Sequence, residues 1–295
     1  MRIRSVWPLL AALFLAACGN ERAFLPSVHD ADLSPAVSSA DPPPVVTPPA
    51  PPVRAAASWG IDLASDTSPF LNQLRHGGIQ FVARYYRDPS SRLPRLTPTE
   101  AQHLSALGLN IVAVWESYSD NPAYFSYARG YWDATKAALE AVATGQPAGT
   151  AIYFGVDFNA QGWQLATVEQ YFRGIDAGMA AVGRGRPPYG IGVYGSGAVC
   201  RLIKGSGLAE FAWLANSTLW AGDRTYRNWN IRQGTRFATL SFDHDADEAW
   251  GQYGAFQVAV DPRSAAPVFA AADQALAPPA EREWVTAALD RGLRR

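Results

Sequence analysis

The sequence predicts an α/β fold, a closed (β/α)8 barrel of the TIM type, preceded by a signal peptide and a proline-rich tether. Three observations support this prediction. Strand-like and helix-like segments alternate from residue 58 onward, which is typical of parallel α/β architecture. Eight segments are strand-like, and several of them end in an acidic or polar residue. The chain has 295 residues, of which 48% are hydrophobic, and this is enough for a substantial core.

The first 18 residues are typical of a lipoprotein signal peptide. Arg2 and Arg4 supply a basic start, an apolar segment follows, and the small residues before Cys18 resemble a bacterial lipobox. The cysteine of such a box becomes lipidated, so we expect a secreted bacterial lipoprotein, held to a membrane at Cys18, in the periplasm or on the cell surface. Cys200 is then left without a partner, and we expect no disulfide.

A linker rich in proline and alanine is expected to follow the signal. Nine of the 22 prolines lie between residues 19 and 54, in a segment without apolar periodicity. This composition cannot form a core and favours an extended polyproline-type chain. The predicted organisation is therefore signal peptide, linker, barrel domain and C-terminal tail at residues 1–18, 19–57, 58–261 and 262–295. A short amphipathic helix is expected at 281–294 in the tail.

Period-two alternation and helix boundary residues place the elements of the barrel. Strands are expected at residues 59–64, 80–86, 110–116, 151–157, 190–194, 211–216, 229–233 and 239–243. Helices are expected at 69–76, 97–107, 127–144, 165–182 and 198–204, with glycines 77, 108, 145 and 183 as stops. The connections 217–228 and 234–238 lack a helical pattern, and 256–260 is a candidate extra strand. An open doubly wound sheet is the alternative, although no G-x-G-x-x-G follows the first strand.

Charge and motif content exclude several classes of function. The net charge of -1 and the pI near 6.4 do not indicate the basic surface that nucleic-acid binding requires. The four histidines have no metal-ligand spacing, and G-x-S-x-G is absent. We therefore expect neither a metal nor a cofactor.

Polar residues at the strand ends carry the functional prediction. On the strand 151–157, Gly155 and Asp157 share one face, and Asp157 lies at the C-terminal end, where a barrel presents its active site. The same alternation aligns Asp62, Arg84, Glu116, Tyr194, Asn216 and Asp243 with Asp157. Carboxyl groups at one mouth raise one another's pKa, so that one stays protonated while another is an anion, as glycoside hydrolysis requires. A structural pairing of Asp62 or Asp243 with Arg84 is the alternative.

Short motifs in this chain resemble those of a known family. They are Gly60-Ile61-Asp62, Ala83-Arg84-Tyr85-Tyr86, the strand 152–159, Gly192-Val193-Tyr194-Gly195, Trp213-Leu214-Ala215 and Asp243-His244-Asp245. Together they resemble, over about residues 58–256, the glycoside-hydrolase-like TIM-barrel domain of secreted actinobacterial proteins, formerly a domain of unknown function. More distantly, they resemble the family 25 lysozymes that cut peptidoglycan. The resemblance implies that Asp62, Asp157 and Asp243 are acids at the barrel mouth and that Tyr194 and Trp213 shape a sugar cleft.

One departure from the lysozyme pattern affects the expected mechanism. That family ends its fourth strand in Asp-x-Glu, whose Glu is the proton donor, whereas this chain has Asp157-Phe158-Asn159. Glu116 is then the candidate general acid, with Asp157 as nucleophile or stabiliser. Substrate-binding residues are expected at Arg84, Tyr86, Asn159, Tyr194, Trp213, Asn216 and Gln233. The expected function is hydrolysis of a cell-envelope glycan such as peptidoglycan; the alternative is a non-catalytic glycan-binding lipoprotein with a degenerate hydrolase cleft.

Overall fold

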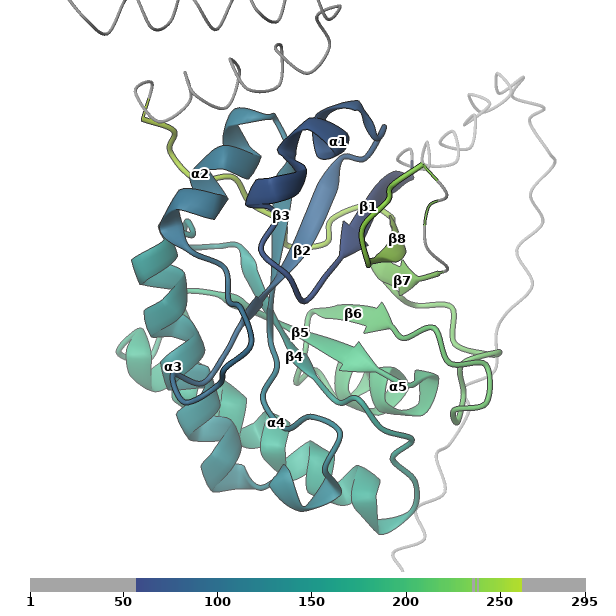
Figure 1. The fold of residues 1–295 in the computed structure, drawn as a ribbon. Coiled ribbons are helices and arrows are strands. Elements are labelled where there is room, and N and C mark those ends of the chain that lie inside the picture. The colour runs from purple at the N-terminus through teal and green to yellow at the C-terminus, as the bar shows by residue number, and fades with distance from the viewer. Residues whose placement is uncertain (1–56, 235–236, 238, 262–295) are drawn as a thin grey trace, which may run out of the picture. The chain divides into compact units, whose positions relative to one another are not determined.

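Eight strands close into a barrel in which each strand pairs with its neighbours in chain order (Figure 1). The structure is a computed structural model that describes residues 57–234, 237 and 239–261. The predicted signal peptide, Cys18, most of the linker and the tail lie outside these residues. The strands are β1 (Ser58–Asp62), β2 (Phe81–Tyr86), β3 (Asn110–Trp115), β4 (Ala151–Gly155), β5 (Gly190–Gly195), β6 (Phe211–Leu214), β7 (Ile231–Gln233) and β8 (Asp245–Ala249).

The closing strand, β8, runs antiparallel to both of its neighbours, whereas β1 to β7 run parallel to one another. The predicted strand at 239–243 is wrong. Its alternation arises because Leu240 and Phe242 are buried, with Phe242 stacked on Phe70 at 4.2 Å between ring centroids. The sequence of β8, DADEA, has no β-branched or aromatic residue. Its extended form therefore depends on pairing with β1 and β7.

Five α-helices pack around the first five strands (Figure 1). They are α1 (Leu71–His76), α2 (Pro98–Ala106), α3 (Tyr127–Thr144), α4 (Trp163–Val182) and α5 (Gly197–Gly205), with short 3-10 turns η1 (Ser68–Phe70) and η2 (Pro122–Tyr124). Among the described residues no helix follows β6 or β7, as the sequence of the connections predicted. The candidate extra strand at 256–260 is reduced to one antiparallel bridge between Phe256 and Ile111. None of the helices in the described ranges is long and apolar enough to cross a bilayer.

Side-chain caps explain where several helices begin. The hydroxyl of Thr97 accepts the backbone N–H of Glu100 at the start of α2, where Pro98 occupies the first turn. Ser126 and Ser196 cap α3 and α5 in the same way. Gly145, in the left-handed conformation at φ 84°, ends α3 as predicted.

The helices α3 and α4 lie against each other with their backbones in close approach. A Cβ on Gly130 would come within 1.9 Å of the Tyr171 carbonyl oxygen, and one on Gly174 within 2.0 Å of the Tyr127 carbonyl oxygen. Glycine is therefore the only residue that fits at either point without separating the helices. This packing fixes α3, and with it the loop between β3 and α3.

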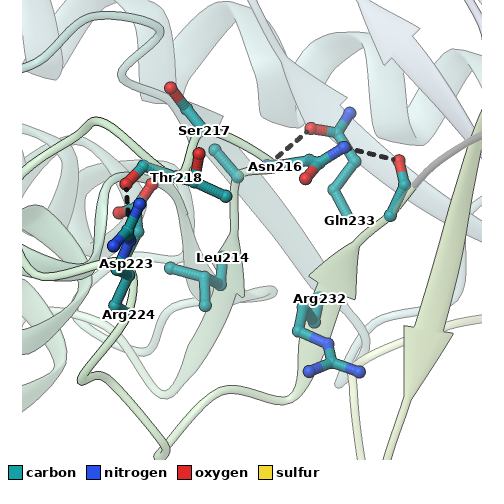
Figure 2. A pocket seen from close by; sticks show the side chains of 10 residues that line it. Leu214, Asn216, Ser217, Thr218, Asp223, Arg224, Arg232 and Gln233 are labelled. Atoms are coloured by element: carbon teal, nitrogen blue, oxygen red, sulfur yellow. Dashed lines mark hydrogen bonds between the residues drawn. The ribbon is translucent and has the colours of Figure 1, made fainter.

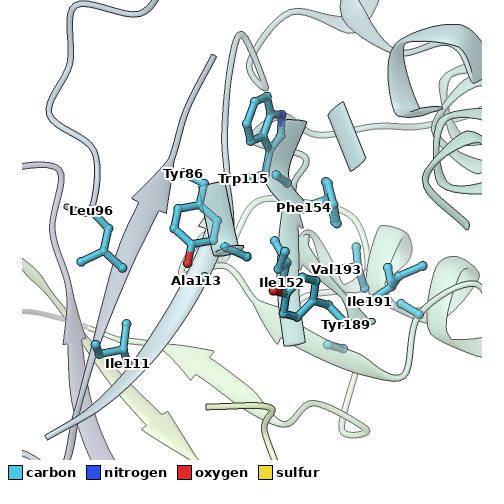
Figure 3. Close-up of a cluster of buried hydrophobic side chains, with 14 of the residues drawn as sticks. Tyr86, Leu96, Ile111, Ala113, Trp115, Ile152, Phe154, Tyr189, Ile191 and Val193 are labelled. Carbon is cyan, nitrogen blue, oxygen red and sulfur yellow. The ribbon is translucent and has the colours of Figure 1, made fainter. Parts of the chain in front are cut away.

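Buried side chains form two layers, one outside the barrel wall and one in its lumen. The outer layer lies between strands and helices and includes Ile111, Ala113, Trp115, Ile152, Phe154 and Val193 (Figure 3). The lumen layer consists of Phe81, Ala83, Val112, Val114, Ala151, Tyr153, Phe211, Trp213, Ile231 and Ala249. The alternation between the two layers determines which side chain at each strand end faces the mouth.

Candidate active site

Five carboxyl groups gather at the barrel mouth. Asp62, Glu116 and Asp157 lie at or just beyond the C-terminal ends of β1, β3 and β4. Asp245 and Asp247 come from the first half of β8, which begins at the mouth because the strand is antiparallel. In the pairing of β1 with β8, Asp62 is opposite Asp245, and Gly60 is opposite Asp247.

Asp62 and Asp247 form a buried pair that shares a proton. Trp213 Nε1 donates to Asp247 Oδ1 at 2.9 Å, and the buried second oxygen, Oδ2, has no hydrogen-bond partner. The Asp247 carboxyl interacts with the carboxyl of Asp62, and burial of both groups favours the state in which one of them is protonated. Burial, with a smaller contribution from Asp245, raises the pKa of Asp62 to about 6, and burial beside Asp62 raises the pKa of Asp247 well above its ordinary value.

Gln233 links the carboxyl groups on one side of the mouth. Its Nε2 donates to Asp62 Oδ2 at 2.9 Å and to Asp245 Oδ2 at 3.3 Å. Its Oε1 accepts the hydroxyl of Tyr194 at 3.2 Å and the backbone N–H of Asn216 at 3.1 Å. These four contacts use both ends of the amide and so fix its orientation. Gln233 therefore positions Asp62 rather than lying free for a ligand.

Glu116 and Asp157 form a second pair, on the opposite side. Burial, and next to it the charge of Asp157, raises the pKa of Glu116 to about 7, while the guanidinium of Arg87 and a hydrogen bond from Ser119 act in the opposite sense. Partial burial and Asp120 also raise the pKa of Asp157. The backbone N–H of Asp157 donates to the Ser119 carbonyl at 2.9 Å, which holds the ends of β3 and β4 together. A pKa of about 7 means that Glu116 holds a proton about half of the time at neutral pH.

An open cleft of about 440 Å³ adjoins the second pair. It lies between the loop after β2 and the loop after β3. Its lining residues are Arg87, Asp88, Ser90, Ser91, Arg92, Leu93, Glu116, Ser117, Tyr118, Ser119, Asp120 and Asp157. Both carboxyl groups therefore border a space that a ligand can enter.

Another cavity, of about 340 Å³, lies beside β6 and β7 (Figure 2). It is lined by Asn216 and Gln233 on one side and by Asp223 and Arg224 on the other. Neither carboxyl pair lines this cavity. The cleft beside Glu116 is consequently the better candidate for an active site.

Two predicted binding residues are on the wrong side of the barrel wall. Arg84 is fully buried between the barrel and α2, where it pairs with Glu100 Oε1 at 2.6 Å and donates to the Leu63 carbonyl at 2.8 Å. Tyr86 also faces outward, and its hydroxyl donates to Gln146 Oε1 at 2.9 Å. The inward residue of β2 is Tyr85, whose hydroxyl donates to Asp62 Oδ1 at 3.0 Å.

The other predicted site residues divide into two groups. The mouth contains Asp62, Glu116, Asp157, Tyr194, Trp213 and Gln233. Asn159 lies outside this group, because its Oδ1 accepts the backbone N–H of Ala221 at 2.9 Å and joins two loops. Asn216 is exposed on the rim, where its Nδ2 donates to the Gly234 carbonyl at 3.0 Å. The prediction that Asp243 ends the last strand is wrong, because Asp243 is exposed and precedes β8.

Asp247, Asp245 and Tyr85 were not predicted. The acids of β8 were missed because the misplaced strand at 239–243 ended before them. The acids at the alternate positions 245 and 247 of DADEA were the available signal, since two acids on one face are unusual for a strand unless that face contacts other polar groups. In the described part of the chain, no group of three or more His, Cys, Asp or Glu side chains is arranged to hold a metal ion.

A family comparison agrees with this geometry. The family described as "Rv2525c-like, glycoside hydrolase-like domain" matches residues 72–264. The chain belongs to this family. Among solved structures, the Tat-secreted protein Rv2525c of Mycobacterium tuberculosis, in complex with HEPES, is similar with a TM-score of 0.56 and 21% identity, over 67% of this chain and 98% of that one. This likeness establishes the fold alone.

Two relatives in Bacillus subtilis are similar in sequence. The uncharacterized protein FadG is 31% identical over 174 residues, which is 57% of this chain and 30% of FadG. The uncharacterized protein YbfG is 31% identical over 197 residues, which is 61% of this chain and 27% of YbfG. The chain thus matches less than a third of the length of either relative. A family GH25 lysozyme from Aspergillus fumigatus has a looser likeness, with a TM-score of 0.44 and 13% identity.

Proposed function

We propose that this member of the glycoside-hydrolase-like family hydrolyses a cell-envelope glycan of the peptidoglycan class. One observation carries the proposal. Glu116, whose pKa is raised to about 7, and Asp157 border the same open cleft. A protonated acid beside an anion at the edge of a cleft is the arrangement that glycoside hydrolysis uses.

In the proposed mechanism, the Glu116 carboxyl donates its proton to the glycosidic oxygen as the bond from that oxygen to the anomeric carbon breaks. The Asp157 carboxylate faces the anomeric carbon and either forms a covalent bond with it or stabilises its developing positive charge. Water then attacks the anomeric carbon, and Glu116 takes up one proton from the water. The two carboxyl groups return to their starting states, so the step is balanced for atoms and charge.

The buried pair of Asp62 and Asp247 acts through electrostatics in this proposal. Its shared proton leaves one negative charge below the mouth, and the charge of Asp62 contributes to the raised pKa of Glu116. The same charge favours positive charge on the sugar ring in the transition state. We assign Asp62 and Asp247 to positioning and charge stabilisation.

The direct test is to incubate the purified full chain with peptidoglycan and analyse the products for new reducing ends. Glu116→Gln is the matched control, because it has the same size and cannot donate the proton. New reducing ends from the wild type and none from the variant support the proposal. Equal release from both proteins contradicts the assigned mechanism.

A non-catalytic glycan-binding protein is the second candidate, favoured by Asn159. The lysozymes that this chain resembles place a glutamate where Asn159 joins two loops through Ala221. If Glu116 does not replace that acid, the wild type binds peptidoglycan in a sedimentation assay and releases no reducing ends. Binding with no cleavage over a range of pH selects this second function.

We further propose that the protein is exported and carries a lipid on Cys18. The support is the lipobox-like sequence at the N-terminus, together with the related M. tuberculosis protein, which is described as Tat-secreted. The folded domain at 58–261 would then reach its glycan through the linker at 19–57. Its partners are the glycan and, through the lipid, a membrane.

A further inference from the structure

Tyr118, in the loop after β3, has a conformation that is unusual for a tyrosine. Its φ is 54°, in the left-handed region that side chains other than glycine rarely adopt, and its side chain is 68% exposed. Only one other non-glycine residue in the described part of the chain, Arg184, has a positive φ. A bulky residue in this region costs folding free energy and persists only where the surroundings hold it.

The residues on both sides of Tyr118 are anchored to neighbouring strand ends. The hydroxyl of Ser117 accepts the backbone N–H of Asp88 at 3.0 Å, and the carbonyl of Ser119 accepts the backbone N–H of Asp157 at 2.9 Å. The backbone between them is thereby fixed. Tyr118 follows Glu116 by two residues, and both line the cleft. The two anchors therefore fix the backbone of Tyr118 at the edge of the cleft.

The ring of Tyr118 is supported from behind. Its centroid lies 6.1 Å from that of Tyr124, whose hydroxyl donates to the buried carboxyl of Asp133 at 2.5 Å. The guanidinium of Arg129 lies 4.8 Å from the Tyr124 ring centroid. Tyr124 is held by these contacts, so the exposed ring of Tyr118 has a fixed aromatic neighbour.

The cleft in front of Tyr118 combines apolar faces with hydroxyl groups. Leu93, which is 57% exposed, lines it from the loop after β2, and Tyr118 lines it from the loop after β3. Serines 90, 91, 117 and 119 also line it. A pyranose ring has the complementary surface, with C–H groups on its face and hydroxyl groups around its edge.

We infer that Tyr118 and Leu93 form a subsite that binds one pyranose ring of a glycan chain by stacking, directly beside the Glu116–Asp157 pair. This inference rests on the proposed function and extends it. The substrate must have a sugar ring next to the bond that is cleaved, so the preferred substrate is an oligomer or polymer rather than a single sugar with a small leaving group.

The test is a binding titration with soluble glycan-strand fragments of peptidoglycan, four sugars long, on the Glu116→Gln background so that nothing is cleaved. Adding Tyr118→Ala is expected to weaken affinity about 2- to 10-fold, while Tyr118→Phe keeps it. Trp132→Ala is the matched control, since Trp132 is 58% exposed and does not line the cleft. Equal affinity of Tyr118→Ala and Tyr118→Phe overturns the inference.

A second comparison uses the backbone conformation. Tyr118→Gly and Tyr118→Ala both remove the ring, but only glycine adopts φ 54° without strain. We expect both to bind glycan equally weakly and Tyr118→Gly to have the higher Tm. An affinity of Tyr118→Gly equal to that of the parent overturns the inference as well. If the parent itself binds no fragment, the proposed function fails, which is distinguishable from a parent that binds regardless of Tyr118.

Discussion

Gly155 on β4 lies directly against the side chain of Glu116. A Cβ at Gly155 would come within 3.3 Å of Glu116 Cγ and 3.5 Å of Glu116 Oε2. The position of the candidate general acid thus depends on the absence of a side chain on the neighbouring strand. This contact links the small residue of β4 to the chemistry proposed for the cleft.

Gly155→Ala is expected to displace the Glu116 carboxyl and lower the rate of glycan cleavage at least tenfold. The nearest atom, Glu116 Cγ at 3.3 Å, needs to move by only a few tenths of an ångström, so the free energy of unfolding should change by less than about 1 kcal/mol. Gly205→Ala is the control, because a Cβ there meets no atom within 4 Å. Steady-state kinetics and urea unfolding of both variants check the prediction, and unchanged kinetics for Gly155→Ala contradict it.

Glu116→Gln is expected to lower turnover by roughly 10² to 10⁴ while leaving glycan binding nearly intact, because general-acid catalysis acts in the transition state. Wild-type activity should fall as the pH rises above about 7, where Glu116 loses its proton. A pH–rate profile of the wild type and single-turnover rates of the variant measure both effects.

The same residue makes stability depend on pH. The pKa of Glu116 in the folded protein, about 7, is above its ordinary value of 4.5, so the native state holds a proton that the unfolded state releases. The free energy of unfolding contributed by Glu116 therefore falls as the pH rises from 4.5 to 7, by roughly 1 to 3 kcal/mol. Glu116→Gln should lack this decrease and exceed the wild type in stability at pH 8. Urea unfolding at pH 5 and pH 8 tests the sign.

Arg84 is expected to support the fold and not the substrate. Arg84→Met leaves the buried carboxylate of Glu100 without its cation, and we expect a loss of about 3 to 5 kcal/mol in the free energy of unfolding. The double variant with Glu100→Leu should recover a large part of that loss. Glycan affinity, measured on the fraction that remains folded, should be unchanged in both. A loss of glycan affinity in the folded Arg84→Met variant would show that Arg84 contributes to glycan binding.

Two substitutions of Asp247 are expected to differ in their effect on stability: Asp247→Asn, which keeps the shape of the side chain, and Asp247→Ala, which shortens it. Asp247→Asn keeps an acceptor for Trp213 Nε1 and a donor toward Asp62, so its stability should remain within about 1 kcal/mol of the wild type. Asp247→Ala leaves the indole N–H unpaired in the lumen and should cost about 1 to 3 kcal/mol more. Chemical denaturation of the two variants distinguishes these values, and equal stability would show that the shared proton and the indole contact contribute nothing.

Cys18→Ser is expected to abolish acylation and move the protein from the membrane fraction to the soluble fraction. The change leaves the folded domain untouched, so glycan binding in solution should be the same as for the wild type. Fractionation together with metabolic labelling by a fatty acid measures the effect. A variant that still sediments with membranes would place the anchor elsewhere.

The sequence predicted the first seven strands and the five helices because their boundaries depend on local signals. Alternating β-branched and aromatic residues mark β3 and β4, and capping residues such as Thr97 mark helix starts. The strand β8 carries no such signal, since its conformation depends on pairing with β1 and β7, which are distant in sequence. Local pattern therefore failed where long-range pairing determines the structure.

The candidate site was predicted correctly where the sequence showed which alternating side chains of a strand face the lumen. On β4, small Gly155 followed by Asp157 left one choice for the inward face. On β2, both faces carry polar side chains, and Arg84 was chosen over Tyr85. The deciding fact was the ion pair of Arg84 with Glu100, which lies on a different element. Pairings across elements are not visible in the alternation of one strand.

The reversed direction of β8 also determines where the polypeptide enters and leaves the barrel. Ser58 begins β1 opposite Ala249, the last residue of β8, and Phe256 then pairs with Ile111 near the start of β3. Entry and exit are both at the base, on the face opposite the carboxyl groups. A surface linkage or a fused domain joined directly before Ser58 or just after Phe256 would therefore start from the far side of the barrel. A barrel attached to a surface at either of these two points would keep its cleft open to an insoluble polymer.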